Sequence, residues 1–423
     1  MRGVVGHTKE EMMMRERMMR MTEEERTRLK EHYLRIFRRE YDNAKTIYEK
    51  VLCLKWLANA GIDLSAYELE KIIVNKREEL PVRMEAIDAL RLLREVMPRK
   101  IQSILMPIYK NRHEEPELRM AALVRIMHTL PHQPIIVQII HTMEREPNHQ
   151  VAMFTYDLLH SFMHTTHTCY KKLAMEIRPL LEMTRYVRGE RLLTSTYRYM
   201  PMFTEDVMSG INMDFATIFG KNSVWPKEVM MSLDTVFNGM WNKYLFQLGF
   251  SQQNIEKLIE KITNKLVRME REEVDTVVRG RRIRESMDIL KEIAKKLNIR
   301  PRVVDTRTPH VMLYLRYKDM DYAVLPINEE MIDNLLEKFI RYGRFETEEL
   351  KRLFNRDPEF KLHTFTFLFE TIKKIPTTIG LPLITKVKMP TVFSAEGEFR
   401  IEMVNNGLKV FLDTEPMLTT TKV

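Results

Sequence analysis

The sequence has few cysteines and glycines, and it lacks any long apolar run. Cys53 and Cys169 are the only cysteines among 423 residues, which excludes a disulfide scaffold. Glycine is limited to 13 residues whereas methionine reaches 32, and good helix formers dominate the first 190 residues, so we expect mainly helix there. No apolar stretch approaches the roughly 18 to 20 residues of a membrane-spanning helix, and no secretory signal is present. A soluble or peripheral chain without a transmembrane segment is therefore predicted.

Catalytic signatures are missing as well. The chain contains no G-x-S-x-G elbow, P-loop, dinucleotide fingerprint or H-E-x-x-H helix, and no Ser or Cys stands in a context that suggests an activated nucleophile. We therefore do not expect an enzyme. The net charge of +9 permits an anionic partner, but 59 acidic residues are interspersed with the basic ones, so nucleic-acid binding is not predicted.

What is present instead is a repeated helical pattern. The segment "LPVRMEAIDALRLL" at 80–93 returns as "EPELRMAALVRIM" at 115–127. Related segments align on small residues, namely Cys53, Ala86, Ala122 and Ala152. Within the first segment the apolar residues fall on one stripe, whereas Arg83, Asp88 and Arg91 lie away from it, so one face is expected to be buried. Because one helix pair cannot bury both its apolar faces, such units stack, and the pattern predicts a two-layered α-helical superhelix of the HEAT type.

The N-terminal stretch 8–40 is highly charged, rich in methionine and free of Gly and Pro. Its Glu-to-Arg spacings of three or four residues predict one long helix that leads into the superhelix. A membrane-surface or calmodulin-target helix is the alternative, although the apolar face is interrupted.

After residue 190 the pattern changes from helical spacing to alternation. Strands are predicted over 211–250, with a hairpin turn at Asn238-Gly239, and a second hairpin is predicted at 310–326. Further helices are expected at 251–270, 276–300, 329–341 and 346–355. The predicted domains are a lead-in helix (1–45), a superhelix with inserted hairpins (46–357) and the beginning of an antiparallel β-sheet domain (358–423). The predicted fold class is mainly α with added β (α+β).

Three histidines form the one candidate metal site. His160, His164 and His167 recur at i, i+4 and i+7, which can place three imidazoles on one helix face and hold Zn²⁺. Alternatively, the Thr165-Thr166 pair ends the helix and leaves solvated loop histidines. Eight of the twelve histidines lie between 113 and 167, so a response to pH is a further hypothesis.

Several stretches resemble the helical domain of vitellogenins, the egg-yolk precursors among the large lipid transfer proteins. They are "YEKVLCLKWLANAG", "KIIVNKREELPVRMEAIDALR", "MPRKIQSILMPIYKNRHEEPELRMAAL" and "REPNHQVAMFTYDLLHS". The later "PKEVMMSLDTVFNGMWNKYLFQLGFSQQNIEKLIEKI" and "IPTTIGLPLITKVKMP" resemble the end of that domain and the entry into the first lipid-facing sheet, in an arthropod-like form. The resemblance runs in order over nearly the whole chain.

The resemblance implies a horseshoe of two helical layers that braces β-sheets around a lipid cavity. It also implies bound phospholipid and neutral lipid, secretion into haemolymph and yolk, and uptake through a vitellogenin receptor. The receptor-binding β-barrel of the family is absent here and the chain ends where the cavity sheets begin, so we expect a fragment or a truncated gene model. A homodimer is a further candidate assembly. The terminal strands supply apolar residues that face either lipid or an ordinary sheet core, namely Phe365, Phe367, Phe369, Leu381 and Leu383.

Two other functions remain open from the sequence. A lipophorin or a triglyceride-transfer subunit would share the same architecture. A cytosolic α-solenoid that binds peptides or proteins along its concave face would need neither lipid nor the C-terminal sheet.

Overall fold

The computed structural model describes residues 22–165, 170–186, 194–204, 209–220, 225–237, 240–253, 310–327, 359–375, 378, 380–404 and 407–420. Its helices are α2 (Glu23–Asn43), α3 (Ile47–Ala60), α4 (Ser65–Val74), α5 (Leu80–Asp88), the 3₁₀ helix η1 (Ala89–Leu93), α6 (Pro98–Lys110), α7 (Pro116–His128), α8 (Gln133–Glu144), α9 (His149–Met163) and α10 (Lys171–Glu182). Within these described stretches, no helix is both long and apolar enough to cross a membrane.

The first described helix begins later than the sequence predicted. Thr22 has extended backbone angles (φ −66°, ψ 159°), and its side chain forms a capping box with Glu25. Such a reciprocal cap fixes a helix start, so α2 begins at Glu23. The predicted single helix over 8–40 is therefore wrong at Thr22, and its residues 8–21 lie outside the described part of the chain.

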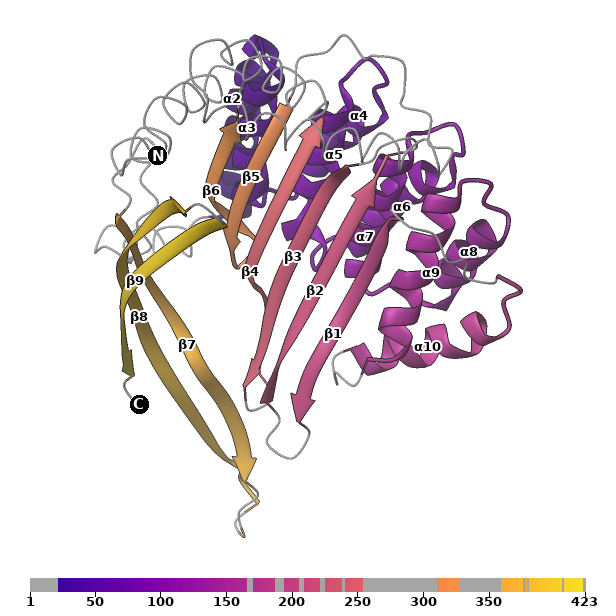
Figure 1. Ribbon diagram of the computed structural model, residues 1–423. Helices are drawn as coiled ribbons and strands as arrows, with labels where there is room; N and C mark the ends of the chain where they lie inside the picture. The colour runs from indigo at the N-terminus through magenta and orange to yellow at the C-terminus, as the bar shows by residue number, and fades with distance from the viewer. Residues whose placement is uncertain are drawn as a thin grey trace, which may run out of the picture.

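Helices α2 to α10, which we call the helical arch, stack in two layers (Figure 1). Helices α3, α5, α7 and α9 pack one on the next, while α4 packs on α6 and α8 on α10. Ala86 and Ala122, two of the aligned small residues, are fully buried in this stack. Stacked like units share one continuous core, which confirms the predicted superhelix.

A repeated ion pair links successive units of the arch. Three residues before Cys53, Ala86 and Ala122 lies a Lys or Arg, and it contacts a glutamate in the turn that precedes the next unit. The pairs are Lys50 with Glu78 (Nζ to Oε2, 2.8 Å), Arg83 with Glu114 (Nη1 to Oε1, 2.7 Å) and Arg119 with Glu146 (Nη1 to Oε1, 3.0 Å). The two arginines also donate from Nε to a main-chain carbonyl of the preceding helix, Ile73 and Tyr109 respectively.

The strands after the arch form one antiparallel sheet in the order β1-β2-β3-β4-β5-β6. They are β1 (Thr196–Thr204), β2 (Ser209–Phe219), β3 (Pro226–Phe237), β4 (Met240–Gln253), β5 (His310–Tyr317) and β6 (Met320–Ile327). Helix α9 packs along β1, α7 contacts β2 and α3 contacts β6. The arch therefore lies against one face of the sheet and contacts both of its edge strands (Figure 1).

Both predicted hairpins are present, but they are parts of this single sheet, which also contains β1. The sequence analysis did not predict β1. The predicted start of a helix at residue 251 is wrong, because Ser251 pairs with Glu228 of β3 and Met312 of β5. Residues 254–270 and the other predicted helices after 275 lie outside the described residues. The predicted domain boundaries at 45 and 357 stay predictions.

A second antiparallel sheet contains β7 (Glu359–Ile375), β8 (Leu383–Val404) and β9 (Gly407–Thr420) in that order. It confirms the predicted sheet from about 359 onward. Figure 1 shows this sheet on the far side of the six-stranded sheet from α9 and α10.

Candidate functional site

The six-stranded sheet has an inverted distribution of polarity. The face covered by the arch, which we call the docking face, carries many polar side chains that are nearly inaccessible to water. They include Asn212, Asp214, Ser232, Asp234, Gln247 and Arg316. Burying such groups is unfavourable unless they are paired, so their presence indicates that the docking face is held by specific contacts rather than by apolar packing alone.

The opposite face, which we call the free face, is apolar and open. Exposed side chains on it come from five neighbouring strands, namely Met200, Met202, Ile211, Phe215, Met231, Leu248 and Leu313. The register aligns them in rows, because Phe215 pairs with Met231 and Met231 pairs with Leu248. Large contiguous apolar patches are rare on monomeric soluble proteins and mark interaction surfaces. The free face is therefore the strongest binding candidate in the described structure.

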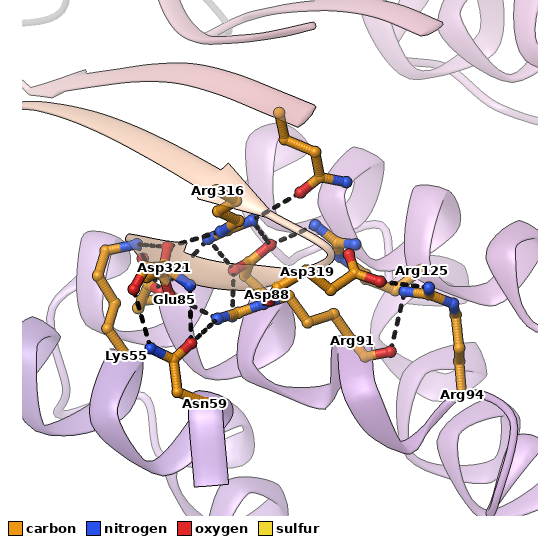
Figure 2. Close-up of polar contacts among 11 residues, drawn as sticks. Lys55, Asn59, Glu85, Asp88, Arg91, Arg94, Arg125, Arg316, Asp319 and Asp321 are labelled. Carbon is orange, nitrogen blue, oxygen red and sulfur yellow. Dashed lines mark hydrogen bonds and ion pairs between the residues drawn. The ribbon is translucent and has the colours of Figure 1, made fainter. Parts of the chain in front are cut away.

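At the β5–β6 end of the sheet, a buried ionic cluster joins the docking face to the arch (Figure 2). Arg316 of β5 donates to Asp321 (Nε to Oδ1, 2.6 Å) and to Asp88 of α5 (Nη1 to Oδ1, 3.1 Å). Arg91 of η1 donates to Asp88 (2.9 Å), to Asp321 (2.5 Å) and to the carbonyl of Asp319 (2.7 Å). The remaining members are Lys55, Asn59, Glu85, Arg94, Arg125 and Asp319.

Asp88 is the centre of this cluster and contacts Arg91, Arg125 and Arg316. Burial alone would raise its pKa, but the guanidinium groups of Arg316 and Arg125 hold the pKa of Asp88 well below its usual range. The carboxylate is therefore charged at any physiological pH. The cluster fixes the turn between β5 and β6 on α5 and η1.

The β2–β3 part of the docking face contains two carboxylates in a different environment. Asp214 and Asp234 are almost fully buried, and neither forms a salt bridge within the described residues. Asp234 accepts hydrogen bonds from the Tyr244 main-chain N–H (2.6 Å) and from Trp241 Nε1 (3.0 Å). Asp214 accepts one from the Ser232 hydroxyl (3.0 Å). The two halves of the interface are therefore held by different means.

The histidine cluster is only partly described. His160 lies in the last turn of α9, and His164 is its C-cap, so the helix ends one residue before His164. The ring centroids of His160 and His164 are 4.4 Å apart. His167 lies outside the described residues, and no group of three or more His, Cys, Asp or Glu that could hold a metal occurs among those that the structure describes. A zinc site at these histidines stays a prediction.

The candidate lipid-facing residues lie in and beside the second sheet. Leu381 and Leu383 are exposed at the start of β8. Phe365, Phe367 and Phe369 lie on β7, whose register with β8 shifts between Phe367 and Phe369. Their contact with lipid stays a prediction.

Sequence reasoning missed the charged docking face. Asp88 and Arg91 lie away from the apolar stripe, a position that is typical of a solvated face, yet Arg91 has no exposed surface. Its partners Asp319 and Asp321 are more than two hundred residues away in the chain. One signal could have revealed the charged docking face. Polar side chains occupy alternate positions of β2 and β3, and the residues between them are apolar. A strand with one exposed face normally places its apolar residues toward the core, so two unlike faces in one sheet call for a decision on which one is covered.

Two family models match the chain over both of its parts. Residues 194–423 match the model described as "Vitellinogen, open beta-sheet", and residues 7–160 match the one described as "Vitellogenin TPR domain". The chain belongs to the vitellogenin family. The six-stranded sheet thus falls in the open-sheet region of the family, and α2 to α8 with most of α9 fall in its helical region.

Relatives and a solved structure agree with this assignment. Vitellogenin-2 of Caenorhabditis elegans is 47% identical over 405 residues, which are 95% of this chain and 25% of the relative. Vitellogenin-5 of the same organism is 49% identical over 93% of this chain and 24% of the relative. The chain therefore spans about a quarter of the length of these vitellogenins. They are nematode proteins, whereas the sequence analysis described an arthropod-like form.

The solved structure titled "Lipid-protein interactions in lipovitellin" aligns with a TM-score of 0.56 and 17% sequence identity. It covers 93% of this chain and 37% of that one. At this identity the likeness shows the fold, and it supports the arrangement of a helical arch on an open sheet.

Proposed function

We propose that this vitellogenin-family chain serves lipid transport and yolk storage, with the helical arch acting as a scaffold that braces a lipid-covered sheet. The observation that carries the proposal is the inverted polarity of the six-stranded sheet. Its polar docking face is bound to the arch through ion pairs and hydrogen bonds, and its apolar free face is exposed. A protein-interaction solenoid would need only the arch. Neither a separate apolar sheet face nor a charged interface to hold it would be required.

The energetics favour a lipid cover on the free face. Removing apolar surface from water contributes about 25 cal/mol per Å². Rows of Met, Ile, Leu and Phe side chains on neighbouring strands make a broad surface rather than a single pocket. Flexible methionine side chains adapt to mobile partners, which suits a layer of acyl chains of mixed length.

The same proposal includes phospholipid and neutral lipid as bound partners and a non-enzymatic role. Leu381 and Leu383 are exposed and apolar, which supports their prediction as lipid-facing residues together with Phe365, Phe367 and Phe369. We also propose secretion, uptake by a vitellogenin receptor through a region outside this sequence, and a homodimer, and family membership supports these proposals.

The test is lipid extraction and mass spectrometry of native-source protein that contains this chain. We expect many phospholipid molecules per chain, together with neutral lipid. Native protein that is recovered folded and free of lipid would contradict the proposal. A matched extraction from a yolk protein of unrelated family in the same tissue controls for lipid that adheres during purification.

A further inference from the structure

Four polar side chains of β2 and β3 lie next to one another in a square on the docking face, namely Asn212, Asp214, Ser232 and Asp234. In the sheet register Asp214 lies opposite Ser232, and Asn212 lies opposite Asp234. Residues two apart on a strand share a face, so the two aspartates are diagonal neighbours on the covered side. The exposed fractions of Asp214 and Asp234 are 3% and 1%. Water therefore does not solvate either carboxylate in the docked sheet.

The hydrogen bonds of the two aspartates are unequal. Both oxygens of Asp234 accept from fixed donors on β4, whereas only Oδ2 of Asp214 accepts one, from Ser232. The Tyr197 hydroxyl faces Asp214 and lowers its pKa, but within the geometric limits of a hydrogen bond Oδ1 of Asp214 and both side-chain atoms of Asn212 have no partner among the described residues. An ionised carboxylate needs donors, whereas a protonated one needs an acceptor for its own proton. Asp214 is thus the better site for a proton.

Among the described residues, the surroundings of the pair supply no unpaired cation. The guanidinium that lowers the pKa of Asp234 is that of Arg94, which is paired with Asp319 of the β5–β6 turn and lies 4.2 Å from the Tyr244 ring centroid. The other polar or titratable groups that face the pair are Tyr197 and Tyr199 from β1, Tyr170 from the start of α10, Ser232 and Asn212 from the same strands, and Trp241 and Tyr244 from β4. Two ionised carboxylates at this place would therefore repel each other, and Arg94, which is shared with Asp319, offsets the repulsion only at Asp234.

Aromatic side chains from the arch cover the four polar side chains of the square. The ring centroid of Phe162 in α9 lies 5.9 Å from that of Tyr197 and 5.4 Å from that of Tyr199. Tyr170, at the start of α10, lies 5.2 Å from Tyr199 and 4.9 Å from Trp241. Water reaches the carboxylates only when these rings separate from the sheet. Full ionisation of the pair thus favours separation of the two layers.

We propose that the Asp214–Asp234 pair makes the packing of strands β1–β4 on α9 and α10 sensitive to pH, so that the layers separate more readily when both carboxylates are ionised. Burial and then the charge of Asp234 raise the pKa of Asp214 to about 8. Burial raises the pKa of Asp234 to about 6. Both folded-state values lie above the ordinary value for aspartate. The resulting destabilisation is therefore absent below about pH 4, grows as pH rises from there toward the folded values, and is complete above about pH 8.

This proposal concerns the contact between two protein layers, and it holds whether or not lipid covers the free face. Other groups of the interface also titrate, among them His128 and Glu228. Burial lowers the pKa of His128 well below its usual range, so its charging destabilises the interface only in acid. Burial raises the pKa of Glu228 to about 7. His128 stays neutral at both about pH 7 and about pH 9, so it does not contribute to a difference between these two values. An Asp214 variant then distinguishes the effect of the aspartate pair from the effect of Glu228.

The experiment is hydrogen exchange measured by mass spectrometry on the full chain at about pH 7 and about pH 9, corrected for the intrinsic pH dependence of exchange. We expect peptides from β1–β4 and α9 to lose about tenfold protection at the higher pH, the change that corresponds to one pKa unit. Asp214→Asn, a neutral isostere of the protonated acid, should remove most of this loss. The control Glu95→Gln deletes one carboxylate of an exposed pair with Lys243 and should leave the loss unchanged.

Equal protection of β1–β4 at the two pH values in the wild-type chain would overturn the proposal. So would an unchanged loss in a folded Asp214→Asn variant. If that variant does not fold, the second measurement is infrared difference spectroscopy of the wild-type protein between the same two pH values. The proposal requires the C=O stretch of a protonated, buried carboxylic acid at neutral pH that disappears at the higher pH, and its absence would contradict the proposal.

Discussion

At the scale of single residues, the docking face shows how the same side chain type is used in opposite ways. Asp88 and Asp214 are both buried aspartates, but Asp88 contacts three arginines whereas Asp214 neighbours another carboxylate. The charged form of Asp88 is therefore stabilised, and the charged form of Asp214 is destabilised. The pH dependences of their contributions to stability have opposite signs.

Asp88→Asn should destabilise the fold strongly. The variant leaves the guanidinium groups of Arg91, Arg125 and Arg316 buried with one carboxylate fewer, and removing one partner of a buried pair costs about 3 to 5 kcal/mol. Because the folded pKa of Asp88 lies below its usual value, its contribution is present above about pH 4 and disappears as pH falls through the folded value.

Denaturant unfolding at neutral and acid pH measures both effects of Asp88→Asn. The stability difference between the wild type and the variant should shrink in acid. Glu95→Gln, which disrupts the exposed pair with Lys243, serves as the control and should cost at most about 1 kcal/mol. A variant as stable as the control at neutral pH would refute the central role of Asp88.

At the scale of elements, the helices of the arch and their stacking were largely predictable from the sequence, whereas the ion pairs between successive units were not. The repeat of apolar residues and small aligned residues predicts helices α3, α5, α7 and α9 and their stacking. The cation three residues before Cys53, Ala86 and Ala122 and the Glu in the turn between units were also visible, as in "EELPVR" and "EEPELR". Their pairing was missed because periodicity identifies a buried stripe, and it does not identify charged residues that are buried between units.

Arg119→Met should loosen one unit boundary of the arch. The variant leaves the Glu146 carboxylate and the Tyr109 carbonyl without their buried donor, at a cost of about 3 to 5 kcal/mol. Since each unit of a solenoid contacts only its neighbours, hydrogen exchange should rise in α6 to α9 and stay unchanged in α2 and α3. The matched variant Lys50→Met, at the half-exposed equivalent pair, should cost about 1 kcal/mol or less. Uniform loss of protection along the arch would contradict this prediction.

At the scale of the whole molecule, the sequence predicted which segments are strands better than how they assemble. Alternation over 211–250 and 310–326 indicates hairpins, but it does not tell which face is covered. Here the rule that apolar residues point to the core is reversed, because the arch meets the sheet through charged and polar contacts. That reversal becomes visible only when Arg316 on β5 is placed beside Asp88 on α5.

The inverted sheet leads to a prediction for the free face. Phe215→Asp and Leu248→Asp place charges on either side of Met231 on the free face, which is opposite to the face that meets the arch. Exposed substitutions of this kind usually change stability by about 0.5 kcal/mol or less, so the melting temperature should hardly move. A charge within a lipid-covered surface is unfavourable, so the phospholipid recovered per chain should fall severalfold.

The control for the free-face variants is Met175→Asp, which places the same charge on an exposed methionine of α10. It should keep both the melting temperature and the lipid content of the wild type. Lipid content that is equal in all three variants would mean that the free face is not the lipid-bearing surface. A fall in lipid that is accompanied by a lower melting temperature would show that these strands depend on the free face for folding. Only a loss of lipid at constant stability, confined to Phe215→Asp and Leu248→Asp, agrees with a surface that the arch holds rigid and that lipid covers.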